Sequence, residues 1–154
     1  MIELRALLPE EIAPYFDDLW REYRKELIAA GYSEGYAEEN VQQSKKSVLS
    51  DGILKPGNHI FYAYSGNHKV GKIWLATETR EGKVDWSIYD VETFPDYRGK
   101  GFGREIMIAA EEFVCTSGGD SIALSVFGNN IVARNLYESL NYETIRVGMK
   151  KKLQ

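Results

Sequence analysis

A glycine-rich segment with two positive charges is the part of this chain best suited to chemistry. Residues 97 to 103 read YRGKGFG, which sets Arg98 and Lys100 among glycines at every second position. Glycine lets the backbone approach a ligand closely and adopt angles that other residues avoid. A periodic helix is predicted next, and the open N–H groups and dipole of a helix start favour an anion. The segment therefore predicts a phosphate or pyrophosphate site.

The spacing of these glycines excludes two common nucleotide-binding loops. A P-loop needs four residues between its first glycine and Gly-Lys-Ser/Thr, and this pattern is absent. A dinucleotide fingerprint needs Gly-x-Gly-x-x-Gly near the start of a β-α-β unit, but Ile106 stands where its third glycine would be. A phosphotransferase would also need paired metal carboxylates after the loop, and none follow.

A second segment combines a short β run with an amphipathic helix. Residues 124 to 142 read LSVFGNNIVARNLYESLNY. The apolar positions Ala133, Leu136, Tyr137 and Leu140 follow the spacing i, i+3, i+4 and i+7, which is typical of one helix face. Asn141 suits the end of this helix, because asparagine also adopts the left-handed conformation.

Together the two segments resemble the GNAT superfamily of N-acetyltransferases, which bind acetyl-CoA. The loop is similar to Arg/Gln-x-x-Gly-x-Gly/Ala, the pyrophosphate loop of that superfamily. The helix is similar to Leu-x-Val-x-x-x-Asn-x-x-Ala-x-x-Leu-Tyr-Glu-x-x-Gly-Phe/Tyr, with Asn141 in place of the glycine. The resemblance implies acetyl-CoA as cosubstrate and these contacts with it: Val91, Thr93, Arg98, Gly99, Lys100, Gly101, Phe102, Gly103 and Asn130.

The predicted elements have the order β-α-α-β-β-β-α-β-α-β. The strands are expected at residues 2–8, 59–64, 70–77, 84–94, 122–127 and 142–151, and the helices at 9–30, 33–50, 102–116 and after residue 130. This order resembles the α/β (α+β) GNAT fold, a mixed and twisted central sheet with helices on both faces. The resemblance also implies that backbone at residues 91 to 93 pairs with the pantetheine arm of CoA.

Composition limits the class of protein. The 154 residues suit one domain, and 44% apolar residues argue against disorder. A net charge of −4 argues against a nucleic-acid partner, which usually selects a basic surface. The single Cys115 is expected to be buried and inert. No leader pattern is seen at the start, and no apolar run is long enough to cross a membrane. We therefore expect a cytoplasmic monomer or homodimer without a metal site.

Tyr137 is the candidate proton donor for the leaving thiolate. This assignment is what the resemblance implies, since a tyrosine at this motif position commonly sits near the thioester sulfur. The helical spacing by itself is equally typical of an aromatic side chain that packs in the core. A tyrosine hydroxyl in the first role would protonate the sulfur as it leaves.

Glu92 is the candidate base that removes a proton from the attacking amine. It lies in the segment WSIYDVETF, where strict alternation puts Asp90 on the same face of the strand. Repulsion between two carboxylates would favour a proton on one of them. Asp90 itself or a chain of water molecules are alternatives, and so is a carboxylate that only holds an arginine.

The expected reaction is transfer of an acetyl group from acetyl-CoA to a primary amine by direct attack in a ternary complex. The acceptor is a small-molecule amine, a peptide N-terminus or a lysine, and acidic and aromatic residues on the first two helices suit a cation. The same residues also suit an ordinary solvated helix face. A non-catalytic acyl-CoA-binding or sensor module of the same fold is the alternative, since it would keep the loop without needing Tyr137.

Overall fold

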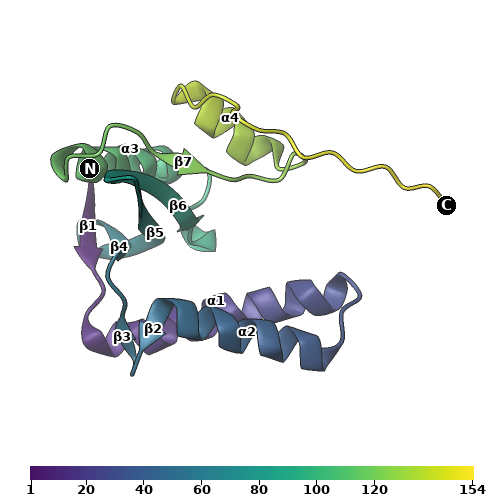
Figure 1. The fold of residues 1–154 in the computed structure, drawn as a ribbon. Helices are drawn as coiled ribbons and strands as arrows, with labels where there is room; N and C mark the ends of the chain where they lie inside the picture. The colour runs from purple at the N-terminus through teal and green to yellow at the C-terminus, as the bar shows by residue number, and fades with distance from the viewer. The chain divides into compact units, whose positions relative to one another are not determined.

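A helical hairpin forms where Pro9 and two glutamates predict a helix start. The computed structural model describes residues 1–154, and α1 spans Pro9–Ala29 (Figure 1). Gly31 follows with a φ of +96°, a conformation that favours glycine and ends the helix. α2 spans Glu34–Val48, and the hydroxyl of Ser33 caps it by accepting a hydrogen bond from the Tyr36 N–H at 3.1 Å.

The central sheet has five strands in the order β1-β4-β5-β6-β7. The pairs β1–β4, β4–β5 and β5–β6 are all antiparallel, so the centre of the sheet is a meander joined by short turns. A separate hairpin of two short strands follows α2 and was not predicted from the sequence. The strand bounds are β1 Ile2–Ala6, β2 Leu49–Ser50, β3 Ile53–Leu54, β4 Asn58–Ser65, β5 His68–Arg80, β6 Lys83–Thr93 and β7 Ala123–Leu124.

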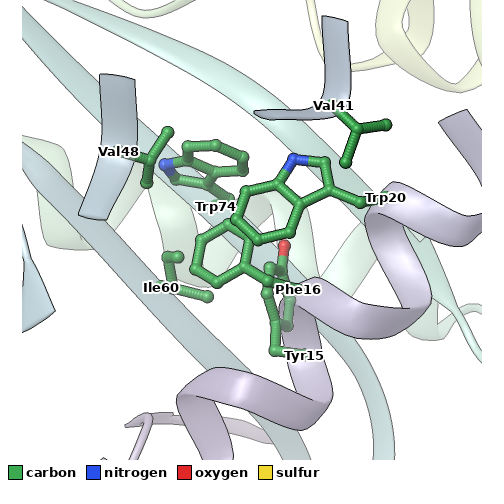
Figure 2. Packing of buried hydrophobic residues seen from close by; sticks show 7 residues of the cluster. All are labelled: Tyr15, Phe16, Trp20, Val41, Val48, Ile60 and Trp74. Carbon is green, nitrogen blue, oxygen red and sulfur yellow. The ribbon is translucent and has the colours of Figure 1, made fainter. Parts of the chain in front are cut away.

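One face of the sheet is covered by the helical hairpin (Figures 1 and 2). Phe16 stacks on Trp20 with ring centroids 4.5 Å apart, and its edge meets Trp74 of β5 at 5.4 Å. Val41 and Val48 of α2 complete this cluster, together with Ile60 of β4 and Tyr15. Each large apolar side chain buried in this way contributes about 1.5–3 kcal/mol relative to exposure.

The opposite face of the sheet is covered by α3, which spans Phe102–Thr116 as the sequence predicts. Ile106, Met107, Ala110 and Val114 are its buried residues. A short 3₁₀ helix, η1 (Pro95–Tyr97), precedes the glycine-rich segment. The two faces of the sheet are thus closed by different helices, in agreement with the expected α/β architecture.

Two predicted strands differ in the structure. Of the expected strand 122–127, only Ala123–Leu124 forms a strand that pairs in the sheet. The expected strand 142–151 is absent. The chain divides into two compact units, residues 1–123 and 124–154. A strand needs a neighbour for its backbone hydrogen bonds, and the second unit contains α4 (Ile131–Ser139) but no second strand. The single-domain expectation stays a prediction.

Candidate functional site

A β-bulge in β6 turns the two carboxylates that follow it toward α1. Leu75 lies opposite Ile88, but Trp74 lies opposite Asp90, so Tyr89 is the extra residue. A bulge of one residue shifts the alternation of side chains by one position. Asp90 therefore shares the sheet face of Trp74, whereas strict alternation would have put it beside Ile88.

The carboxylate of Glu92 shares this face and lies near a lysine. Lys72 is directly opposite Glu92 in the ladder, and its Nζ is 3.6 Å from Glu92 Oε2 and 3.3 Å from Asp90 Oδ2. The expected repulsion between the two carboxylates is therefore offset by a shared cation. Sequence reasoning missed Lys72, because a lysine in an apolar strand carries no local signal that it faces inward.

Tyr15 of α1 also contacts this group. Its hydroxyl donates a hydrogen bond to Asp90 Oδ2 at 2.6 Å, and its ring lies 4.7 Å from Lys72 Nζ. Burial, reinforced by the negative charge of Asp90, raises the pKa of Tyr15 well above its usual range. Tyr15 therefore remains protonated and acts as a donor. Its role could not be read from the helix, where it looks like one more apolar position.

Arg98 links Glu92 to the glycine-rich segment. Its Nε donates to the Thr93 carbonyl at 3.0 Å, and its Nη2 lies 3.4 Å from Glu92 Oε1. The guanidinium thus contacts the end of β6, while most of its surface stays exposed. The structure brings together Glu92, Thr93 and Arg98, three residues predicted for the site.

The glycine-rich segment has the backbone that its sequence predicts at two positions. Gly99 has a φ of +73° and Gly101 a φ of +84°, and a Cβ at either position would meet no atom within 4 Å. Gly101 is the N-cap of α3 and supplies no side-chain acceptor, so the first turn of that helix is left uncapped. Gly103 lies within α3, so its conformation does not require glycine.

β5, β6 and α3 approach one another closely at Gly71. A Cβ at Gly71 would stand 2.4 Å from the Glu92 carbonyl oxygen and 2.7 Å from Ile106 Cδ1. Both distances are too short for a real Cβ, so neighbouring atoms would have to shift. The Glu92 oxygen belongs to the backbone and cannot move aside easily. Gly71 therefore lets α3 pack closely on the sheet next to Glu92.

Tyr137 is placed by the two ends of α4. Asn130 begins the helix, since its Oδ1 accepts a hydrogen bond from the Ala133 N–H at 3.2 Å. Asn141 ends it with a φ of +68°, as the sequence predicts, and its N–H donates to the Glu138 carbonyl at 3.0 Å. The Tyr142 N–H donates to the Tyr137 carbonyl at 2.9 Å, which completes a Schellman motif.

A cavity of about 360 Å³ lies within the second unit beside Tyr137. Burial raises the pKa of Tyr137, so the hydroxyl keeps its proton at neutral pH. The ring of Tyr142 lies 5.9 Å away from that of Tyr137 and also lines the cavity. Other lining residues are Leu124, Val126, Arg134 and Arg146.

Comparison with known proteins decides the family. The model of the Acetyltransferase (GNAT) family matches residues 12–142, which is most of the chain. The chain belongs to the GNAT family of acetyltransferases. The resemblance seen in the two motifs is therefore confirmed, and the protein is an acyltransferase of the GNAT type.

Individual relatives agree with this assignment. The Uncharacterized N-acetyltransferase YycN of Bacillus subtilis (strain 168) is 30% identical over 158 residues, covering 99% of each protein. The N-alpha-acetyltransferase RimI of Mycobacterium tuberculosis (strain ATCC 25618 / H37Rv) is 27% identical over 65% of this chain and 60% of its own. The crystal structure of YycN has a TM-score of 0.86 at 28% identity, over 100% of this chain and 99% of the other. The GNAT fold is thereby confirmed.

Several carboxylates on the helices of this GNAT protein are already paired. Asp18 pairs with Arg21 at 2.9 Å, and Glu22 pairs with Lys25 at 3.2 Å. Glu38 pairs with Arg24. These contacts are typical of a solvated helix face, the alternative that the sequence left open.

Other polar residues lie outside the site. Cys115 is exposed, so the expectation that it is buried was wrong. It follows the buried Val114 on α3 and therefore falls one step around the helix from the core face. His59 packs against Trp86 with ring centroids 5.2 Å apart, and burial lowers its pKa. None of the helices is long and apolar enough to span a membrane.

Proposed function

We propose that this protein is an acetyl-CoA-dependent N-acetyltransferase that acts on a primary amine by direct attack in a ternary complex. The observation that carries this proposal is the juxtaposition of an uncapped helix start with a carboxylate at the end of β6, joined through Arg98. The first feature suits the pyrophosphate of CoA, and the second suits an amine that must lose a proton.

The glycine segment is proposed to bind the pyrophosphate through backbone N–H groups. The open space at Gly99 and Gly101 supports this proposal, because a ligand can approach the backbone there. Lys100 adds a charge, and its Nζ currently contacts the Asp96 carbonyl at 3.4 Å. β7 has only two residues, so most of the β6 edge that faces it has no strand partner, which supports pantetheine pairing at Val91 and Thr93. Phe102, Gly103 and Asn130 are the remaining proposed contacts.

The chemistry requires two proton movements. Glu92 accepts, directly or through a water molecule, the proton that a protonated amine must lose before it attacks. The neutral nitrogen then forms a bond with the thioester carbonyl carbon, and the carbon–sulfur bond breaks. Tyr137 gives its hydroxyl proton to the leaving sulfur and regains one from the new amide nitrogen. The products are the N-acetyl amine and CoA, and Glu92 releases one proton to solvent.

Two observations support these role assignments. Asp90 accepts the Tyr15 hydroxyl and only 19% of its side chain is exposed, whereas Glu92 pairs with Lys72 and Arg98 but is 37% exposed. Glu92 is therefore the more accessible of the two carboxylates. The raised pKa of Tyr137 suits a group that must carry a proton at neutral pH. The acceptor class is proposed as a small-molecule amine, a lysine or a peptide N-terminus. The last is supported by the name of the relative RimI, an N-alpha-acetyltransferase.

Release of CoA from acetyl-CoA tests this function. A panel of polyamines, aminoglycosides, amino-acid derivatives and peptides should include at least one acceptor that raises the rate of release well above the rate without amine. The assay should use Cys115→Ser, because the exposed thiol of Cys115 would react with the reagent that detects CoA. Tight binding of acetyl-CoA without amine-dependent release would instead indicate a non-catalytic sensor module.

A further inference from the structure

Lys72 is the one charged side chain that the structure buries, with 8% of its surface exposed. Burying an ammonium group is costly unless partners compensate it, and apolar replacements of buried ion pairs are often neutral or stabilising. The stability of the fold therefore gives little reason for a lysine at this position. A functional reason for Lys72 is therefore expected among the groups that its ammonium contacts.

Three groups lie close to the Lys72 ammonium. Nζ lies 3.3 Å from Asp90 Oδ2, 3.6 Å from Glu92 Oε2 and 4.7 Å from the ring centroid of Tyr15. The Tyr15 hydroxyl donates to the same Asp90 oxygen at 2.6 Å. Asp90 and Tyr15 therefore hold the ammonium in place independently of Glu92.

The two carboxylates differ in what they face. The Asp90 side chain is 19% exposed and has two partners from the interior, whereas the Glu92 side chain is 37% exposed and also meets Arg98 at 3.4 Å. Asp90 thus anchors the lysine, and Glu92 presents its carboxylate between an interior cation and the glycine-rich segment. The extra residue at Tyr89 is what brings both carboxylates to the face of Lys72.

We propose that Lys72 is a positioning residue for acetyl transfer, which holds the Glu92 carboxylate in the orientation that accepts the proton of the amine. This inference rests on the proposed function, in which Glu92 is the acceptor. Without Lys72, Glu92 would keep only its ion pair with the exposed Arg98 and would sample more rotamers. A misplacement of about 1 Å at a reacting group can cost on the order of 100-fold in rate. Lys72 acts through Glu92 and need not touch either substrate.

A double-mutant cycle tests this role. Lys72→Met should lower kcat by roughly 10-fold or more, with the KM for acetyl-CoA little changed, because the glycine-rich segment is untouched. Lys72→Arg keeps the charge and should recover most of the loss. In the Glu92→Gln background, Lys72→Met should have no further effect on kcat, because the group that it positions is already disabled.

A matched control is available on the same strand. Lys69 pairs with Glu11 at 3.6 Å and lies 3.9 Å from the ring centroid of Tyr62, but it does not contact Glu92. Lys69→Met removes an equivalent charge and should leave kcat unchanged. Thermal unfolding of both variants separates a loss of folded protein from a loss of rate.

Several outcomes would overturn the inference. A normal kcat in Lys72→Met would do so, and so would an equal loss of kcat in the wild-type and Glu92→Gln backgrounds. If Lys72→Met does not fold, Asp90→Asn replaces it, because this change removes the anchor of Lys72 and is judged by the same cycle. A wild-type protein that releases no CoA with any amine would overturn the proposed function and this inference together.

Discussion

Arg98 and Glu92 form an ion pair that ties the glycine-rich segment to the end of β6. Arg98 Nη2 lies 3.4 Å from Glu92 Oε1, and the same guanidinium donates through Nε to the Thr93 carbonyl at 3.0 Å. The proposed base and the proposed phosphate-binding segment are thus in direct contact. A substitution of Arg98 should therefore affect both the binding of acetyl-CoA and the reaction of the amine.

Arg98→Ala should weaken acetyl-CoA binding by on the order of 10-fold, because it removes one exposed charge-assisted contact. Titration calorimetry measures this affinity. Arg98→Lys keeps the charge but loses the planar donor pair, so it should restore only part of the binding. Arg80→Ala removes an arginine that pairs with Glu78 and serves as the control. An unchanged affinity in Arg98→Ala would remove Arg98 from the proposed contacts.

Gly101→Val should abolish acetyl-CoA binding, because a branched side chain would occupy the open space at the start of α3. With acetyl-CoA at about 100 times its dissociation constant, the wild-type protein should gain about 2.7 kcal/mol of unfolding free energy and the variant none. ATP and NAD should stabilise the wild type far less.

Gly66→Val is the control for backbone strain in that experiment. Gly66 has a φ of +59°, and a Cβ there would also meet no atom within 4 Å, but it lies in the turn between β4 and β5. Both variants should lose roughly 1–2 kcal/mol of stability from the left-handed conformation. Only Gly101→Val should lose the response to acetyl-CoA, and equal responses would contradict the pyrophosphate assignment.

Tyr137→Phe should reduce turnover by on the order of 100-fold while acetyl-CoA affinity changes little. The substitution keeps the ring that packs near Tyr142 and removes only the hydroxyl. Steady-state kinetics with the best acceptor amine measure the effect. If Tyr137 only packs, Tyr137→Phe should turn over normally, and a loss of stability should appear only in Tyr137→Ala.

Tyr15 makes the stability of the protein sensitive to alkaline pH. Its pKa is raised in the folded state by burial and by Asp90, so above about 10 the unfolded chain loses this proton while the folded chain keeps it. The free energy of unfolding should therefore fall as the pH rises from about 10 toward the folded pKa. Tyr15→Phe should show a smaller fall in denaturant titrations, whereas Tyr89→Phe, at an exposed tyrosine, should match the wild type.

Local patterns predicted the parts of the fold whose cause is local. The bounds of α3 agree with the structure, and Asn141 ends α4 in the left-handed conformation that its side chain tolerates. These features depend on helix periodicity and on the backbone preference of single residues. The alternation of residues 142–151 is also a local pattern, but strand formation needs a partner, and that strand is absent.

The arrangement around Glu92 depends on contacts that are distant in sequence. The bulge at Tyr89 is defined only by its register with β5, so the sequence does not show that Asp90 and Glu92 lie on the face opposite to that of Ile88. Lys72 and Tyr15 reach the two carboxylates from another strand and from α1. The roles of Glu92, Tyr137 and the predicted acetyl-CoA contacts stay predictions.

Direct transfer in a ternary complex is best tested by mass spectrometry of both the amine and the protein after one equivalent of acetyl-CoA is added. Cys115→Ser should be used so that the exposed thiol cannot take up an acetyl group. Direct transfer predicts that acetylated amine and CoA form in equal amounts, only when the amine is present, and that the protein carries no acetyl group at any time. Acetylated protein that forms before the amine is added, and then passes its acetyl group on, would contradict direct transfer in a ternary complex.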